Sequence, residues 1–128
     1  GFRIKNSGLR IMHWRDLVVW QKSHALTLLI YKISGSFPAD EKYALTSQLR
    51  RSCASISTNI VEGQSRNTTK DYINFLYNAR GSLEETRYHI LLAKDLNYIG
   101  INQFADLENS CAEISKMLNA LIKRLKLK

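Results

Sequence analysis

Apolar residues recur at helical spacing in four stretches of this 128-residue chain, and a single proline interrupts the pattern. The final stretch is the most regular, because its apolar residues are separated alternately by three and four positions. This spacing keeps one face of a helix apolar over several turns and predicts a seam that packs against other helices. The residues of this stripe are Phe104, Leu107, Cys111, Ile114, Leu118, Leu121 and Leu125.

The first predicted helix covers about 15–34 and is ended by Gly35. Its apolar residues surround most of its circumference and do not form a single stripe. A helix of this kind is buried on more than one side. In a bundle this small we expect the second side to meet another subunit. The apolar residues are Leu17, Val18, Val19, Trp20, Leu26, Leu28, Leu29, Ile30, Tyr31 and Ile33.

The second predicted helix covers about 42–62, with Asp40 available as its cap and Gly63 as a left-handed residue that ends it. Small residues fill 52–58, which predicts the close approach of a neighbouring helix. The residues expected to face inward from this helix are Leu45, Leu49, Cys53, Ile56 and Ile60.

The third predicted helix opens at Thr68 or Thr69, and Asp71 lies in the first turn, where the helix dipole favours an acid. Gly81 in its middle predicts a contact face, because a mid-helix glycine costs about 1 kcal/mol relative to alanine. The alternative is a solvated helix that tolerates the glycine. The inward residues are Tyr72, Leu76, Ala79, Leu83, Thr86, Ile90 and Ala93.

Short links, such as 97–100 before the last helix, make neighbouring helices antiparallel. The sequence therefore predicts an all-α, up-down-up-down four-helix bundle. We assign the bundle domain to residues 13–128, and we expect residues 1–12 to form an N-terminal extension that is partly non-native.

Composition places the chain among ordinary globular proteins, with 45% apolar and 23% charged residues. No run of about 18 apolar residues occurs, so no membrane span is expected. The first residues lack the apolar core of a signal peptide. Cys53 and Cys111 fall on apolar stripes and are expected to be buried free thiols. Together these features predict a cytoplasmic protein.

The formal net charge of +8 is located at the two ends of the chain. Residues 1–11 contribute +3 and residues 116–128 contribute +5, while residues 12–115 hold 11 basic and 11 acidic side chains. Basic ends are an electrostatic footprint for phosphate. Solvated lysine tails are equally common in proteins that bind no anion, so charge alone leaves both interpretations open.

Two groups of basic residues are candidates for RNA contact. Arg50 and Arg51 flank the apolar stripe of the second helix, and the end of the last helix carries the others. Such side chains bind phosphate and supply affinity without reading the sequence. Their alternative role at the end of the last helix is to complement the helix dipole. The residues at that end are Lys123, Arg124, Lys126 and Lys128.

Aromatic residues near helix ends have two interpretations. Trp14, Tyr43 and Tyr98 are suited to stack on bases, or they pack the ends of the bundle.

Motifs of catalysis and metal binding are missing from the sequence. A carboxylate-bridged metal site in a bundle needs Glu-x-x-His pairs, and no such pair occurs. His13, His24 and His89 show no metal spacing, and no glycine-rich phosphate loop is present. We therefore expect no enzyme activity, no metal and no cofactor.

Several runs in order resemble a family of bacterial four-helix bundle proteins, the 23S ribosomal RNA intervening-sequence proteins. The resemblance covers roughly 13–126. One departure is Ser57, which replaces the family's proline. The matching runs are 13–17, 19–22, 45–51, 55–56, 59–60, 62–63, 75–76, 79–85 and 91–94.

The resemblance implies a homo-oligomeric ring, typically a pentamer, and an association with ribosomal RNA. A distantly similar bundle is an accessory to retroelement reverse transcriptases, which implies the alternative of a protein-interaction scaffold or accessory subunit for a nucleic-acid enzyme. Arg66 joins the candidate RNA contacts, or it braces the turn between helices in a buried network with Asn59 and Glu62. The motif residues carried over are Asn59, Glu62, Gly63, Gly81, Ser82 and Glu85.

Overall fold

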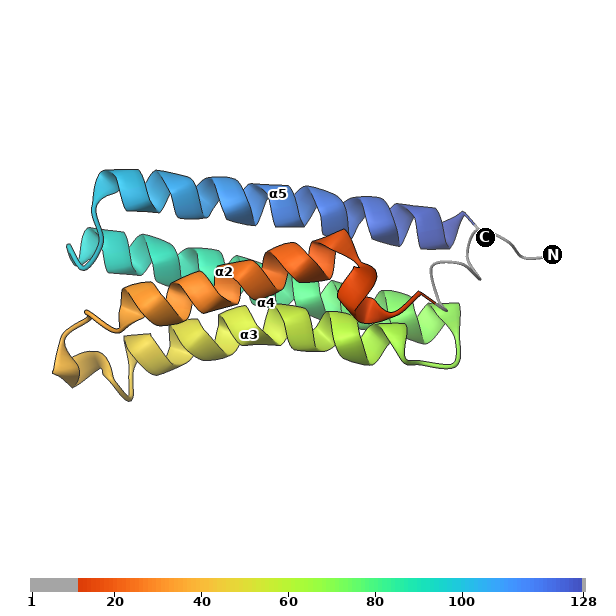
Figure 1. Cartoon of the computed structure of the whole chain (residues 1–128), viewed down its shortest axis with the longest axis horizontal. Coiled ribbons are helices and arrows are strands. Elements are labelled where there is room, and N and C mark those ends of the chain that lie inside the picture. Colours follow the sequence, from red (N-terminus) through yellow and green to blue (C-terminus); the bar gives the residue numbers. More distant parts are fainter. Residues whose placement is uncertain (1–11, 128) are drawn as a thin grey trace.

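The computed structural model describes residues 12–127, and within that range the chain is all-α, with four long helices and no strand. The chain reverses direction at each connection, so the long helices lie side by side (Figure 1). Two short 3-10 helices, η1 and η2, precede the first and second long helices. The elements are η1 Trp14–Asp16, α2 Val18–Ser34, η2 Ala39–Glu41, α3 Leu45–Gln64, α4 Thr69–Asp95 and α5 Ile101–Lys126.

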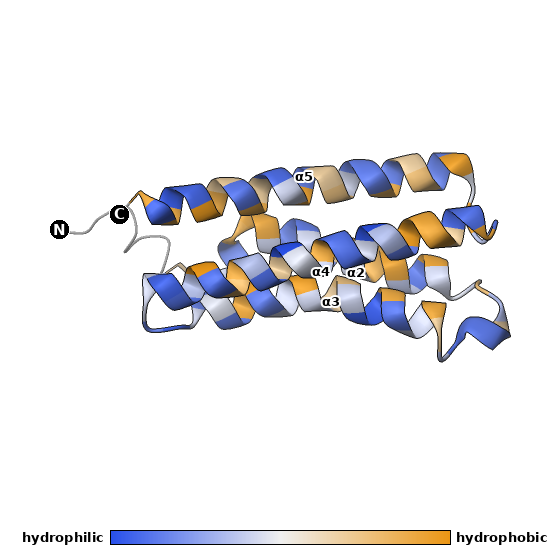
Figure 2. Cartoon of the chain, turned by 180° about the vertical axis from the view of Figure 1, so that it is seen from behind, coloured by the Kyte–Doolittle hydropathy of each residue, from blue (hydrophilic) through white to orange (hydrophobic). Residues whose placement is uncertain are grey.

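The core consists of the predicted stripes. Every inward residue predicted for the second and third helices is buried, and so is the stripe of the last helix except for the partly buried Phe104. Hydrophobic and hydrophilic residues alternate along α5 in Figure 2, as expected of a helix with one face on the core. Both cysteines are buried and free. No helix in the described range is long and apolar enough to cross a membrane.

A line of small polar residues joins α3 to α4. The Thr86 hydroxyl donates to Ser52 Oγ at 3.0 Å, and the hydroxyls of Ser55 and Ser82 lie 2.9 Å apart. These short side chains let the two helices approach closely, as the small residues of 52–58 predicted. The hydroxyls satisfy one another inside the interface, which a buried polar group requires.

Gly63 is needed for this close approach and not for ending the helix. The prediction of a left-handed cap there is wrong, because α3 continues to Gln64 and no glycine in the described range has a positive φ. A Cβ at Gly63 would lie 2.7 Å from the Cβ of Phe75 and 3.1 Å from Tyr72. Glycine is present here because α4 leaves no room for a side chain.

Helix starts also differ in two places from the sequence prediction. The chain is extended at Leu17, so residues 14–16 form the separate helix η1 and α2 begins at Val18. Asp40 does not cap α3; the Glu41 carboxylate accepts from the Leu45 amide at 3.3 Å. In contrast, the start of α4 is as predicted, since the Thr68 hydroxyl accepts from the Asp71 amide at 3.1 Å.

The apolar surface of α2 extends beyond the core. Val18, Leu28 and Leu29 are exposed, and Leu28 is 59% accessible. The surface between α2 and α5 is hollowed in two places, of about 170 and 300 Å³. Lys22 and Glu113 bridge this surface at 3.4 Å. The second apolar side that the sequence predicted for this helix is therefore present and open in the single chain.

Candidate nucleic-acid interface

A basic face is formed where the first half of α4 lies against the end of α5. The Tyr77 ring is approached by the Arg80 guanidinium at 4.9 Å and by the Lys126 ammonium at 5.2 Å. Arg80 also donates to Asn119 Oδ1 at 2.9 Å, which fixes it across the two helices. Lys123 is exposed on the turn between Asn119 and Lys126. We call these five residues the α4–α5 basic face.

Charge on this face is not neutralised by α5 itself. Residues 116–126 carry four basic side chains and no acid. The negative end of the α5 dipole stabilises cations there, so part of this charge serves the helix. The exposed Lys123 and Lys126 remain able to contact phosphate.

Two other predicted contacts lie elsewhere around the same end of the bundle. Arg124 points to the other side of α5, where it lines the α2–α5 hollow with Asp16 and Met117. Arg66 lies in the turn between α3 and α4, and its guanidinium stacks 4.4 Å from the Phe75 ring centre. Neither belongs to the basic face.

Arg50 has a structural task. Its Nε donates to Ser34 Oγ at 2.8 Å, and its Nη2 donates to the Tyr31 carbonyl at 3.1 Å. The same guanidinium covers the Tyr31 ring at 4.7 Å. Arg50 thus supplies hydrogen-bond donors to acceptors at the carboxyl end of α2. Its neighbour Arg51 is exposed, about 20 Å along α3 from the turn that holds Arg66. Lys128 lies outside the described residues.

The three candidate aromatic residues are in different settings. Tyr98 packs the bundle end, because its hydroxyl donates to Glu41 at 2.7 Å and its ring lies 5.4 Å from Phe37. That hydrogen bond raises the pKa of Tyr98. Tyr43 is 86% exposed. Trp14 lines a groove between α2 and α3 together with Trp20 and Tyr31.

The predicted network of Asn59, Glu62 and Arg66 is not buried as a unit. Glu62 and Arg66 are exposed. Asn59 instead donates to the Ser55 carbonyl at 2.8 Å and to its hydroxyl at 3.1 Å. Through Ser55 the amide joins the polar line that includes Ser82.

The remaining motif residues give no pocket. Gly63 is buried against α4, while Gly81 and Glu85 are exposed on it. A Cβ at Gly81 would meet nothing within 4 Å among residues 12–127, so the predicted contact is not made within that range.

The closest approach to a catalytic pair is Ser52 beside His89. Ser52 Oγ lies 3.3 Å from His89 Nδ1, but Ser52 is only 4% exposed and its hydroxyl also accepts from Thr86. A substrate cannot reach that oxygen. Within residues 12–127, no cluster of three or more His, Cys, Asp or Glu side chains is arranged to hold a metal.

Sequence reasoning found Lys123 and Lys126 but missed Tyr77, Arg80 and Asn119 as their partners. These residues are far apart along the chain, and their meeting depends on how α4 and α5 are rotated about their axes. The chemistry available to the face is electrostatic: phosphate contacts from the cations and one aromatic ring between them.

Comparison with known proteins agrees with this fold. The family model described as 23S rRNA-intervening sequence protein matches residues 15–120. The chain therefore belongs to that family, as the sequence motifs predicted.

Solved structures include a similar protein of unknown function from the S23 ribosomal protein family of Bacteroides thetaiotaomicron. It is 31% identical, with a TM-score of 0.77, and the match covers 83% of this chain and 99% of the Bacteroides chain. Neither description names an enzymatic activity. A search of curated proteins gives no match.

Proposed function

We propose that this protein is a non-enzymatic, cytoplasmic bacterial RNA-binding bundle whose α4–α5 basic face contacts the phosphates of structured RNA, ribosomal RNA first among them. The observation that carries the proposal is the arrangement around Tyr77, where cations from two helices meet at the acid-free end of α5. Cations in this setting supply affinity that falls steeply with salt. The family's description, which names 23S rRNA, supports the same choice.

We further propose that antiparallel up-down-up-down subunits assemble as a homo-oligomeric ring, a pentamer, through the open apolar side of α2. Val18, Leu28 and Leu29 support this assembly, because exposed apolar patches of this kind mark interaction surfaces. Repeating a modest basic face around a ring raises the effective concentration of each site. Weak individual contacts then give useful avidity.

The test is a fluorescence-anisotropy titration with a structured 23S rRNA fragment over a range of salt concentrations. The double variant Lys123→Glu/Lys126→Glu should lose at least tenfold in affinity at low salt. Its salt slope should fall by about two, because roughly one counterion is released for each phosphate contact.

A matched control is Lys32→Glu/Lys42→Glu, which makes the same change in net charge on exposed lysines outside the basic face. It should retain most of the affinity. Equal losses in the two variants would show that net charge, and not this face, governs binding. Affinity that does not change between low and high salt would refute phosphate contact altogether.

A second candidate function is an accessory subunit or scaffold for a nucleic-acid enzyme, such as a retroelement reverse transcriptase. The exposed side of α4 favours it, since Tyr88 and Leu91 are 59% and 39% accessible and Gly81 leaves the backbone open nearby. Capture of a protein partner should survive the Lys123→Glu/Lys126→Glu change and fail in Tyr88→Glu. RNA binding should respond in the opposite way.

A further inference from the structure

Exposed apolar side chains adjoin in the middle of two helices of the described range, α2 and α4. Leu28 and Leu29 form the α2 patch, and Tyr88 and Leu91 form the α4 patch. The remaining exposed large apolar residues outside α2 lie at or beyond helix ends. They are Met12, Tyr43, Leu96, Ile101 and Leu127. The α4 patch is therefore the second surface of the bundle that is suited to an apolar contact.

The two patches face away from each other. Each of α2 and α4 packs on both α3 and α5, so α2 and α4 lie at opposite corners of the bundle. Accordingly, α2 lies in front in Figure 1, and α4 lies in front in Figure 2, which is the view from behind. A contact between the α2 patch and the α4 patch must therefore be made between two copies of the chain.

Contacts between helices show that the two patches lie at the same height along the bundle. The α2 patch adjoins Thr27, which donates to the Cys53 carbonyl on α3 at 3.4 Å. The α4 patch adjoins His89, whose Nδ1 lies 3.3 Å from the Oγ of Ser52, the residue before Cys53. Rotation about an axis parallel to the helices moves no residue along that axis. Neighbouring copies in such a ring can therefore bring the two patches together.

A ring of more than two copies needs two different faces on each subunit. Two faces that point in directly opposite directions build an open filament, so the faces of a closed ring must lean to the same side. Leu29 lines the hollow toward α5. Leu91 lies on the helix face of Arg87 and Lys94, which contact Glu108 and Phe104 of α5. Both patches lean toward α5, which allows the contacts to close with α5 facing the centre.

Charges around the two patches are complementary. Residues 18–34 of α2 carry two lysines and no acid, whereas residues 84–91 of α4 carry Glu84 and Glu85 and one arginine, Arg87. Like charges that face each other across an interface oppose association. The lysines therefore disfavour contact between two copies of α2, and the acids of α4 favour the approach of α2.

We propose that the α2 patch of one copy packs against the α4 patch of the next copy in a head-to-tail contact, with Leu28 beside Tyr88. The inference rests on the proposed ring and supplies the second surface that the ring needs. The α4–α5 basic face is centred on Tyr77, about 16 Å along α4 from Tyr88, and stays open to RNA. This contact and a protein partner exclude each other on the exposed side of α4.

The experiment is cross-linking of the oligomer with a short bis-maleimide, because both native thiols are buried. The variant Leu28→Cys/Tyr88→Cys should give a ladder of covalent oligomers on a denaturing gel, since each cross-link joins α2 of one copy to α4 of the next. The two positions lie on opposite faces of one chain, so the short reagent cannot join them within a subunit. Leu28→Cys alone and Tyr88→Cys alone should stay at 14.7 kDa.

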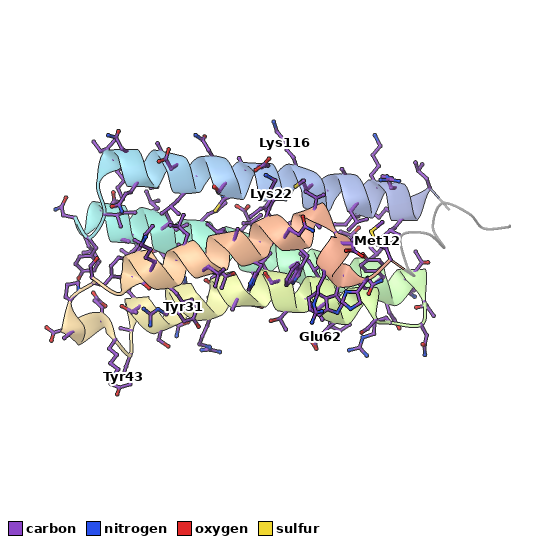
Figure 3. The ribbon with its side chains drawn as sticks, viewed as in Figure 1. Met12, Lys22, Tyr31, Tyr43, Glu62 and Lys116 are labelled. Atoms are coloured by element: carbon purple, nitrogen blue, oxygen red, sulfur yellow. The ribbon has the colours of Figure 1, made fainter. Side chains whose placement is uncertain are left out.

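The matched control is Leu28→Cys/Tyr43→Cys, which should give no ladder. Tyr43 is exposed but lies at one end of the bundle, beyond the carboxyl end of α2 (Figure 3). Light scattering should show that each variant keeps the mass of the natural oligomer before cross-linking. Leu29→Cys/Leu91→Cys tests the same contact if the first pair of substitutions changes that mass.

Cross-linked dimers from Leu28→Cys alone would show that α2 meets α2 and would overturn the proposal. A natural-mass oligomer that gives no ladder from either pair of substitutions would overturn it too, and would leave the α4 patch free for a protein partner. If the natural chain is monomeric, the proposed ring fails and this inference fails with it. RNA binding is then still decided by the anisotropy titration.

Discussion

Two glycines that look alike in sequence have opposite surroundings in the structure. Gly63 is pressed against Phe75 and Tyr72, while Gly81 stands in open space on α4. The first glycine is there for packing, and the second meets nothing among the described residues.

Gly63→Ala should therefore destabilise the protein by about 1–3 kcal/mol, because the new methyl group overlaps Phe75. Gly81→Ala should stabilise it by about 0.5–1 kcal/mol, the usual gain when a helical glycine is replaced. Urea unfolding followed by circular dichroism measures both. A loss of stability in Gly81→Ala would show that another chain covers that position.

The two cysteines are chemically protected by their burial. Removal from water raises the pKa of Cys53 to about 11 and that of Cys111 to about 12, against an ordinary value of 9.0. The reactive thiolate is therefore scarce near neutral pH.

Native protein at pH 8 should not react with an aromatic disulfide reagent, and both thiols should react in guanidinium chloride. The sign of the pH effect follows from the raised pKa values: stability is full below pH 9 and falls as pH rises from 9 toward 11–12, because only the unfolded thiols ionise there. Fast labelling of one thiol in native protein at pH 8 would contradict this account.

At the scale of elements, Arg50 was predicted to contact RNA but instead connects α3 to the end of α2. Its two hydrogen bonds reach the last turn of α2, where carbonyls lack partners within the helix. Ser34, one of those partners, is buried.

Arg50→Ala should cost about 1–3 kcal/mol of stability, because it removes two charge-assisted hydrogen bonds from the end of α2. RNA affinity should change less than twofold. Arg51→Ala, which removes an exposed arginine from the neighbouring position, should alter stability by no more than about 0.5 kcal/mol. Urea denaturation and anisotropy on the same samples separate the effects. Weakened RNA binding in Arg50→Ala at unchanged stability would reverse the assignment.

Helix stripes could be predicted from sequence, while contacts between helices could not. The residues of α3 and α4 predicted to face inward are all buried, since helical periodicity fixes which residues share a face. The start of α4 was equally readable from Thr68 and Asp71. The sequence did not show that Glu41, and not Asp40, accepts from the first amide of α3, because this depends on where the preceding loop turns.

The same limit applies to the candidate site. Lys123 and Lys126 were visible as a run of charge, but Tyr77 and Arg80 become their neighbours only once α4 and α5 have packed. The rings at 14 and 20 gave no signal of a groove, because an aromatic residue at a helix end reads equally well as packing. Spacing along one helix cannot show which residues of another helix it will face.

At the scale of the whole molecule, the surface proposed for assembly and the surface proposed for RNA lie on different helices. The exposed Val18 and Leu29 of α2 suit a second copy of the chain, and the α4–α5 basic face suits phosphate. Disrupting the basic face should then leave the oligomer intact, whereas disrupting the oligomer should remove the avidity of RNA binding.

Leu28→Glu should dissociate the oligomer, because it places a charge on the exposed apolar side of α2, while its 59% exposure leaves the fold of each subunit intact. Light scattering should report a multiple of 14.7 kDa for the natural chain and 14.7 kDa for the variant. Ile101→Glu is the control, since Ile101 is 74% exposed at the start of α5. A natural chain that is monomeric at micromolar concentration would remove the ring from the proposal.

The hydroxyl line between α3 and α4 also limits how the molecule can move. Ser52 pairs with Thr86 and Ser55 with Ser82 in a single alignment of the two helices. Sliding one helix past the other by a turn would break both contacts and leave Ser52 and Thr86 only their bonds to carbonyls of their own helices. We therefore expect α3 and α4 to move as one rigid unit. Any rearrangement on binding RNA should come from displacement of α2 or α5 against this pair.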